Sequence, residues 1–175
     1  MQYTSYYICP LGRLLLAADD QGLTGLWFEG EKYFAGTLDP DHRFGDCPAF
    51  ARTREWLDLY FSGSDPGFLP PLHRIGTSFQ MEVWNLLLDI PYGQTTTYGA
   101  LAKRIAARRG LARMSAQAIG GAVGHNNISI IVPCHRVVGS DGSLTGYAGG
   151  IDKKEYMLRL EGVDTSHLAS QKIHR

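Results

Sequence analysis

Hydrophobic positions form short runs in the first third of the chain and recur at helical spacing after it. Three runs rich in Tyr, Ile, Leu and Trp open the sequence, separated by the turn signals "PLG" and "DDQG": "TSYYICP", "GRLLLAAD" and "GLTGLWFEG". Short apolar runs bounded by such turns are typical of β-strands. Residues 4–30 therefore predict an antiparallel meander of three strands.

A helix is predicted next, in "PAFARTREWLDLYFSG". Its apolar residues recur at helical spacing, Pro48 suits the first turn and Gly63 suits the stop. A Gly- and Pro-rich connection covers residues 62–76, and we place a domain boundary at its end. The chain is thus expected to form two domains, residues 1–76 and residues 77–175.

The second domain is predicted to be mainly helical. "TSFQMEVWNLLLDI" has one apolar helical face and a candidate cap in Thr77 or Ser78. Two short helices, in "TTTYGALAKRIAARRG" and "RMSAQAIGGAVGHN", fit the helix-turn-helix pattern. A buried strand "ISIIV" and a final helix "DKKEYMLRLEG" follow, with a loose tail from about residue 166. The predicted fold class is α+β: a small N-terminal antiparallel sheet with a helix, then a mainly helical C-terminal domain.

The second helix of the helix-turn-helix pattern is unusually rich in small residues. Its sequence, "AQAIGGAVG", holds three alanines and three glycines. A glycine inside a helix costs about 1 kcal/mol relative to alanine. Such a surface lets another molecule approach closely, and a narrow groove of DNA is one candidate. Tight packing against another helix would explain the pattern equally well.

Composition narrows the class of protein. A hydrophobic fraction of 44% and three tryptophans support a packed core. The chain has neither an apolar run of membrane-spanning length nor a signal peptide, so we expect a cytoplasmic protein. The chain has three cysteines, an odd number, at positions 9, 47 and 134, and no CxxC motif. Its histidines do not have the spacing typical of metal ligands. These patterns argue against a disulfide framework and against a metal site.

The net charge of zero hides an asymmetry along the chain. Residues 1–76 hold ten acidic and six basic residues, whereas residues 77–175 hold seven acidic and eleven basic ones. Five of the basic residues cluster in the helix-turn-helix: Lys103, Arg104, Arg108, Arg109 and Arg113. Such a segment can approach phosphates, or it can be a solvated helix face.

Cys134 directly precedes His135. A cysteine becomes a nucleophile when a neighbour stabilises its thiolate, and histidine is suited to that task. Adjacent residues of a strand point to opposite faces, so cooperation requires a backbone turn at Pro133 or a bridging water. Glu161, at the close of the final helix, is a candidate to orient the imidazole. The residues alone leave open whether Cys134 is a nucleophile or an inert core thiol.

The surrounding motif is more specific. "PCHRVVGSDGSLTGYAGG", preceded by "GGAVGHNNISIIV" and followed by "KKEYMLRLEG", closely resembles the O6-alkylguanine-DNA alkyltransferases of the bacterial single-function type, also called methylated-DNA–protein-cysteine methyltransferases. "CPLGRLLLAADDQGLTGLWF" is similar to their N-terminal domain. The resemblance implies a DNA repair protein that flips O6-alkylguanine out of double-stranded DNA and transfers the alkyl group irreversibly to its own cysteine. It implies minor-groove binding by a monomer, no cofactor and no membrane.

The resemblance also implies roles for individual residues. Cys134 is the acceptor, His135 deprotonates it through a water, and Glu161 orients His135. Asn126 braces the region behind the cysteine. Tyr98 hydrogen-bonds the ring of the flipped guanine and helps to protonate it as it leaves.

A second group of residues is implied to contact DNA or the flipped base: Tyr147, Ala148, Gln117, Ala118, Gly121 and Arg113. Tyr147 and the backbone amide of Ala148 correspond to the pocket wall and the donor to O6. Gln117 stands where the family commonly has an arginine that fills the gap left by the flipped base, and Arg113 is a candidate partial substitute. The turn "AKRIAARRGLARMS" is longer than usual, and "HNN" replaces the more usual Asn-Pro.

Three other functions remain compatible with the sequence. The first is a non-catalytic protein of the same fold that binds alkyl lesions. The second is a cysteine hydrolase or thiol-redox enzyme, which would turn over many substrates. The third is a helix-turn-helix regulator, in which Cys134 would have no chemical role.

Overall fold

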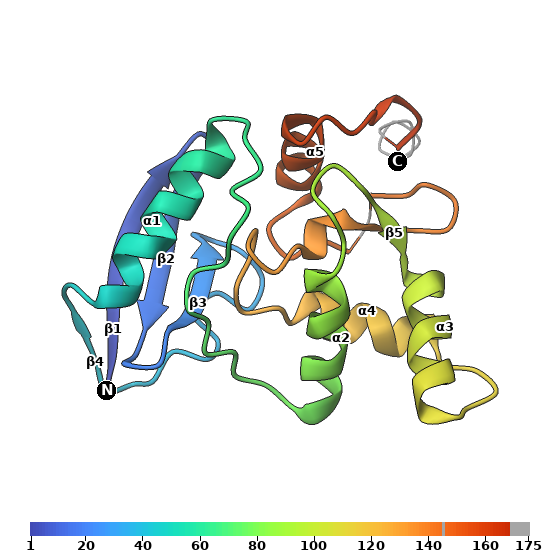
Figure 1. The fold of residues 1–175 in the computed structure, drawn as a ribbon, viewed down its shortest axis with the longest axis horizontal. Coiled ribbons are helices and arrows are strands. Elements are labelled where there is room, and N and C mark those ends of the chain that lie inside the picture. Colours follow the sequence, from blue (N-terminus) through green and yellow to red (C-terminus); the bar gives the residue numbers. More distant parts are fainter. Residues whose placement is uncertain (145, 169–175) are drawn as a thin grey trace. The chain divides into compact units, whose positions relative to one another are not determined.

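The computed structural model describes residues 1–144 and 146–168, which form two compact units (Figure 1). The N-terminal unit contains Met1–Gly76 together with Asn127–Ile131. The C-terminal unit contains Thr77–Asn126 and continues from Val132. Residues 127–131 therefore pack with the N-terminal unit, although the sequence predicted them inside the second domain.

The N-terminal unit is built on a four-stranded sheet in the order β3-β2-β1-β4. The strands β1 (Gln2–Cys9), β2 (Gly12–Ala18) and β3 (Leu23–Phe28) pair antiparallel, as the meander prediction requires. The short strand β4 (His42–Phe44) pairs parallel with β1, so the sheet is mixed. No hydrophobic pattern predicts β4, because all its residues are exposed and no apolar run marks it.

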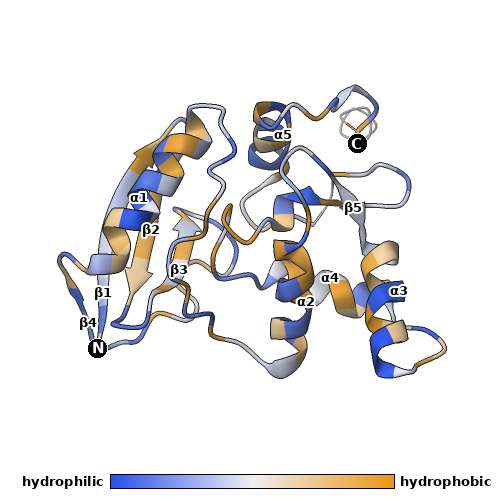
Figure 2. Ribbon diagram, in the orientation of Figure 1, coloured by the Kyte–Doolittle hydropathy of each residue, from blue (hydrophilic) through white to orange (hydrophobic). Residues whose placement is uncertain are grey.

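Burial in this unit follows the hydrophobic pattern (Figure 2). The central strand β2 is buried on both faces, which explains its unbroken apolar run. One face carries a cluster of Leu15, Ala17 and Trp27. The helix α1 (Pro48–Phe61) begins at its proline and buries an apolar stripe that includes Trp56, as predicted.

The C-terminal unit consists of helices and one short pair of parallel strands. Its elements are α2 (Ser78–Leu88), β5 (Thr96–Thr97), α3 (Tyr98–Arg109), α4 (Ala116–Gly124), the 3₁₀-helix η1 (Cys134–Arg136), β6 (Val137–Val138) and α5 (Ile151–Leu160). The α+β fold class predicted from the sequence is confirmed. No helix in the described part of the chain is long and apolar enough to cross a membrane.

Local capping sets the boundaries of these helices. Thr77 caps α2 in a reciprocal capping box with Gln80. Gly110, with φ of 66°, ends α3 in the left-handed conformation that favours glycine. Ser115 opens α4, and Trp84 Nε1 donates to a carbonyl oxygen of α4 at 2.9 Å, which ties α2 to it.

Two predictions for the end of the chain are wrong. "ISIIV" is not a strand, because Ile128 forms only an isolated bridge with Leu26, and φ of 73° at Ile130 turns the backbone. The loose tail was placed too early, because Leu168 is buried in a cluster with Leu144 and Leu158. The rest of that predicted tail, residues 169–175, lies outside the described residues.

Candidate active site

Cys134 lies in a backbone turn. The 3₁₀-helix η1 begins at this residue, after a hydrogen bond from Cys134 N to the carbonyl oxygen of Val132 at 2.8 Å. Arg136 N donates to the carbonyl oxygen of Pro133 at 3.0 Å, which closes the turn. This is the turn that cooperation between Cys134 and His135 requires. The cysteine is 6% exposed.

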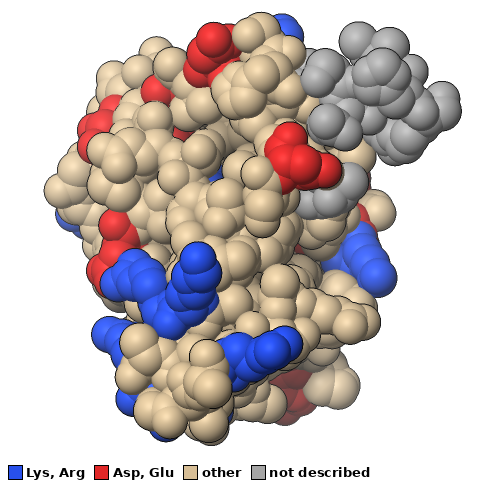
Figure 3. Space-filling model, turned by 90° about the vertical axis from the view of Figure 1, so that its right-hand side faces the viewer, with Lys and Arg blue, Asp and Glu red and all other residues tan. Residues whose placement is uncertain are grey.

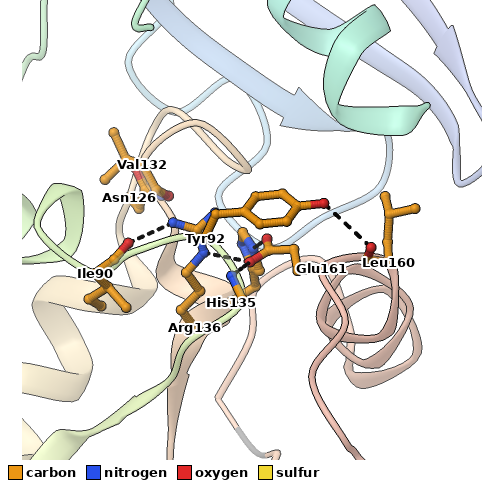
Figure 4. A network of polar contacts seen from close by, with 9 residues as sticks. Ile90, Tyr92, Asn126, Val132, His135, Arg136, Leu160 and Glu161 are labelled. Atoms are coloured by element: carbon orange, nitrogen blue, oxygen red, sulfur yellow. Dashed lines mark hydrogen bonds and ion pairs between the residues drawn. The ribbon is translucent and has the colours of Figure 1, made fainter. Parts of the chain in front are cut away.

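Asn126 places an amide donor beside the thiol. It follows α4, and its Nδ2 lies 2.7 Å from the carbonyl oxygen of Val132 and 3.2 Å from Cys134 Sγ. One amide group has two N–H donors, so it can make both contacts. A donor at this distance favours the negatively charged form of the sulfur. Figure 4 shows Asn126 next to Val132.

His135 is held by a buried carboxylate (Figure 4). Its Nε2 lies 2.6 Å from Glu161 Oε2, and both side chains are 0% exposed. Burial lowers the pKa of His135 below its ordinary value of 6.5, and this outweighs the opposite effect of the carboxylate. The imidazole is therefore neutral at neutral pH. With its Nε2–H donated to Glu161, Nδ1 carries the lone pair that can accept a proton.

Glu161 is kept ionised by its partners. It caps the C-terminal end of α5, and its Oε1 accepts hydrogen bonds from Arg136 Nε at 2.8 Å and from Gly93 N at 3.0 Å. Burial raises the pKa of Glu161, but the contacts with His135 and Arg136 outweigh it and lower this pKa to about 2. Arg136 also donates to the carbonyl oxygen of Ile90 at 2.7 Å, so its side chain ties the turn at Cys134 to the segment after α2.

Tyr98 reaches the same region through the β5–β6 pair. In this parallel pair Thr97 is opposite Val138, so the chain segment that begins α3 lies beside the one that leaves η1. Burial, together with the charge of Cys134, raises the pKa of Tyr98 to about 12. Its hydroxyl is therefore a hydrogen-bond donor at neutral pH. A Cβ placed on Gly146 would lie 2.9 Å from this hydroxyl oxygen, so only glycine lets the loop pass here.

Sequence reasoning missed Lys154. This lysine of α5 is 0% exposed, and its Nζ lies 5.9 Å from the centroid of the Tyr98 ring. Burial lowers its pKa to about 8, while the nearby thiolate of Cys134 acts in the opposite direction. A signal existed: Lys154 precedes Met157, Leu158 and Glu161 at the spacing of one helix face, so a lysine occupies the buried stripe.

The loop that follows η1 holds two more of the predicted residues. Tyr147 is buried, Ala148 is half-buried, and Gly150 N closes a turn onto the carbonyl oxygen of Tyr147 at 3.1 Å. Thr145 lies outside the described residues.

The other predicted residues lie on the surface of α4 and of the segment before it. Gln117, Ala118 and Gly121 are exposed on α4, and Arg113 is exposed in the turn before it. The hydroxyl of Ser115 accepts hydrogen bonds from the backbone N–H groups of Gln117 and Ala118. The structure thus separates a buried group around Cys134 from an exposed group on α4.

Packing within the unit does not explain the glycines of α4. A Cβ added at Gly121 or Gly124 would have no described atom within 4 Å, whereas one at Gly120 would touch the Tyr98 ring at 3.9 Å. Close helix packing therefore accounts for none of the exposed positions. The surface beside Gly121 and Gly124 is therefore open in the described part of the chain, and another molecule can approach the backbone of α4 there.

Basic side chains gather on one part of the face in Figure 3, over the unit that carries α3. Arg109 is engaged within the protein, because its guanidinium lies 2.7 Å from Glu82 and 5.1 Å from the ring centroid of Phe79. The other four basic residues of the predicted cluster are exposed: Lys103, Arg104, Arg108 and Arg113. Among the described residues, no three His, Cys, Asp or Glu side chains are arranged to bind a metal ion.

Comparison with known proteins identifies the family. Residues 2–72 match the family described as "6-O-methylguanine DNA methyltransferase, ribonuclease-like domain", and residues 78–163 match its "DNA binding domain". The methylated-DNA–protein-cysteine methyltransferase of Haemophilus influenzae is 41% identical over 163 residues, which cover 92% of this chain and 87% of the relative. The chain belongs to the 6-O-methylguanine DNA methyltransferase family.

Other proteins with the same description are similar over most of the chain. The methylated-DNA–protein-cysteine methyltransferase of Methanosarcina acetivorans is 42% identical, over 91% of this chain and 98% of its own. The crystal structure of Mycobacterium tuberculosis O6-methylguanine methyltransferase matches with a TM-score of 0.78 and 41% identity, over 92% of this chain and 93% of that one. A structure of the Mycobacterium tuberculosis protein in complex with DNA matches with a TM-score of 0.76 and 40% identity, over 95% and 94%.

Proposed function

We propose that this protein repairs DNA by moving the alkyl group from O6 of an alkylated guanine to its own Cys134. The observation that carries the proposal is the buried chain of contacts from Glu161 through His135 to the turn that holds Cys134. It occurs in a member of the 6-O-methylguanine DNA methyltransferase family.

The chemistry follows from the positions of the protons. The thiol proton of Cys134 passes through a water to Nδ1 of His135, while Glu161 holds the opposite nitrogen. The thiolate attacks the alkyl carbon, a new S–C bond forms, and the C–O6 bond breaks with its electron pair on the guanine. Tyr98 donates a hydrogen bond that stabilises this leaving group, and Asn126 supports the sulfur.

DNA binding involves the exposed group of residues. O6 of guanine lies inside the base stack, so the nucleotide must be rotated out of the duplex, at a cost of a few kcal/mol. We assign the small, exposed face of α4, with Ala118 and Gly121, to the minor groove, and Gln117 to the gap left by the flipped base. Arg113 and the other exposed basic residues approach phosphates.

Each molecule acts once. The S–C bond of a thioether has no easy reversal, so the protein is consumed and needs no cofactor. Tyr147 and Ala148 line the pocket for the flipped base. We propose that the protein acts as a monomer, with residues 77–175 carrying DNA binding and alkyl transfer and residues 1–76 forming the N-terminal domain.

Intact mass measurement tests the proposal. The protein is incubated with duplex DNA containing O6-methylguanine, and we expect a gain of one methylene per molecule, located on the peptide with Cys134. Cys134→Ser should gain no mass and still bind the duplex. No added mass on wild-type Cys134 would contradict the proposal. Binding without transfer would indicate a lesion-binding protein, and repeated turnover would indicate a hydrolase or redox enzyme.

A further inference from the structure

The five residues before the active-site turn belong to the other unit. Asn126 and Val132 are part of the C-terminal unit, whereas Asn127–Ile131 between them packs into the N-terminal unit. We call these five residues the clamp loop. The chain returns from it at Val132, two residues ahead of Cys134.

Backbone hydrogen bonds fix the clamp loop to the outer strand of the sheet. Leu26 N donates to the carbonyl oxygen of Asn127 at 2.8 Å, and Ser129 N donates to the carbonyl oxygen of Leu26 at 2.9 Å. The side chain of Asn127 adds a bond to the carbonyl oxygen of Ile75 at 2.9 Å. A proline at position 127 would have no side-chain donor and could not make that bond.

A buried carboxylate pins the same loop. Glu31 is 8% exposed, and its Oε1 accepts hydrogen bonds from Phe28 N at 2.7 Å and from Ser129 Oγ at 3.3 Å. Burial of a charged group is costly unless hydrogen bonds compensate for it. Glu31 thus joins the end of β3 to the clamp loop through polar contacts that have a definite geometry.

The clamp loop is held in a strained shape. Ile130 is buried and has φ of 73°, a left-handed conformation that is rare for a β-branched residue. Such a conformation persists only where its surroundings impose it. The hydrogen bonds from the loop to Leu26 and Glu31 hold it in this conformation.

Asn126, which contacts the thiol of Cys134, also joins the two ends of the clamp loop. Asn126 Nδ2 bonds the carbonyl oxygen of Val132, which joins the two ends of the loop, and it also contacts Cys134 Sγ. Any relaxation of the loop that moves Val132 therefore changes the position of the amide relative to the sulfur.

We propose that Ser129 and Glu31 are positioning residues for alkyl transfer, through which the N-terminal unit sets the geometry of Asn126 and Cys134. This inference rests on the proposed function of Cys134 as the acceptor. It gives the N-terminal unit a part in the reaction beyond that of a scaffold. An error of about 1 Å in the placement of reacting groups can cost about a hundredfold in rate.

The test compares variants of the full-length protein. Ser129→Ala and Glu31→Leu remove the hydrogen bond between these two side chains, whereas Glu31→Gln keeps an acceptor oxygen. Thr53→Ala is the matched control, because Thr53 Oγ1 makes a buried bond to the carbonyl oxygen of Ala49 at 2.8 Å, within α1 and away from the loop. Four quantities are measured: the single-turnover rate of methyl transfer, the affinity for undamaged duplex, the melting temperature, and the pH dependence of Cys134 alkylation by a haloacetamide.

Ser129→Ala and Glu31→Leu should slow methyl transfer about ten- to a hundredfold and shift the pH dependence of alkylation, with unchanged duplex affinity. Glu31→Gln should behave like wild type. Thr53→Ala should lower only the melting temperature. If Ser129→Ala likewise lowers the melting temperature but keeps the wild-type rate and pH profile, the loop is purely structural and the inference is wrong.

The haloacetamide measurement separates this inference from the proposed function. It needs no alkylated DNA, so it reports on the positioning of Cys134 even if the wild-type protein takes up no methyl group. Failure of methyl uptake by wild type would contradict the proposed function alone. An unchanged pH dependence of haloacetamide alkylation in Ser129→Ala would contradict only the positioning role of Ser129 and Glu31.

Discussion

His135 Nε2 lies 2.6 Å from Glu161 Oε2, and neither side chain is exposed to solvent. The second oxygen of the same carboxylate accepts a hydrogen bond from Arg136, so the negative charge of Glu161 is balanced by the guanidinium. His135 can then stay neutral while its ring is held in one orientation. A neutral imidazole can take a proton from Cys134, whereas a protonated one cannot.

Glu161→Gln should lower the transfer rate by about a hundredfold or more. The amide has one acceptor oxygen in place of two, and once this oxygen bonds Arg136 and Gly93, the NH2 group faces His135 and no longer fixes its tautomer. The substitution should also cost about 3 kcal/mol of unfolding free energy, since Arg136 is left buried without an opposite charge. Single-turnover kinetics and urea denaturation measure the two effects. Glu155→Gln, on the same helix and paired with the exposed Arg159, is the control and should react at the wild-type rate. Wild-type kinetics in Glu161→Gln would refute the assigned role.

Acid should reduce stability in two windows. The pKa of His135 in the folded protein is below 6.5, so as pH falls the imidazole is protonated in the unfolded chain before it is protonated in the folded one. The stability that the neutral His135 contributes is therefore present above pH 6.5 and is lost as pH falls below that value. The folded pKa of Glu161 is about 2 against an ordinary value of 4.5, so its contribution is present above pH 4.5 and lost as pH falls toward 2. Urea denaturation over a pH series measures this dependence. Constant or rising stability from pH 6.5 down to 4.5 would contradict a neutral, buried His135.

Tyr98→Phe should slow methyl transfer about ten- to a hundredfold with little change in fold or duplex affinity. The ring keeps its contacts, and only the hydroxyl that we propose as the donor to the leaving guanine is lost. Tyr92→Phe is the matched control, because its hydroxyl bonds the carbonyl oxygen of Leu160 at 3.4 Å instead. Rapid-quench measurement of transfer compares the two. Equal rates in both variants would remove Tyr98 from the chemistry.

Lys154→Met should shift the pH dependence of Cys134 alkylation toward higher pH. A buried cation near a thiolate stabilises the charged sulfur, and methionine fills a similar volume without the charge. The melting temperature should not fall, because the cost of burying the ammonium disappears. Lys153→Met, one residue earlier and only half-buried, is the control. An unchanged alkylation profile in Lys154→Met would count against an electrostatic role.

Gly121→Leu should weaken duplex binding at least about tenfold and raise helix stability by about 1 kcal/mol. The added side chain meets open space in the free protein but blocks the approach of DNA to α4. Fluorescence anisotropy and thermal unfolding measure the two effects. Ala51→Leu, at an exposed position of α1, should leave affinity unchanged. Wild-type affinity in Gly121→Leu would exclude this face of α4 from the interface.

Much of the fold could be predicted because its signals are local. The capping box at Thr77, the stop at Gly110 and the unbroken apolar run of β2 each depend on neighbouring residues alone. The contact between His135 and Glu161 agrees with the orienting role predicted for Glu161, and both residues have local signals, since His135 follows Cys134 and Glu161 closes the final helix. The roles of Cys134 and His135 in alkyl transfer remain predictions. So do the roles of Gln117 and Arg113.

The features that escaped prediction depend on contacts between distant parts of the chain. "ISIIV" has the composition of a buried strand, yet Ile130 turns the backbone because Leu26 and Glu31, about a hundred residues earlier, hold the clamp loop. The strand β4 is too short and too polar to produce a pattern. Lys154 was overlooked because a lysine on an amphipathic helix normally faces solvent.

The β5–β6 pair bears on how sequences of this kind can diverge. Thr96 and Thr97 with Val137 and Val138 carry the link between Tyr98 and the turn at Cys134. The stretch of residues 110–115, which joins α3 to α4, lies outside that link. Insertions there can alter the basic surface that we propose for DNA binding, while the spacing between Tyr98 and Cys134 is preserved. Related sequences can therefore differ in how they bind the duplex while the geometry of alkyl transfer stays the same.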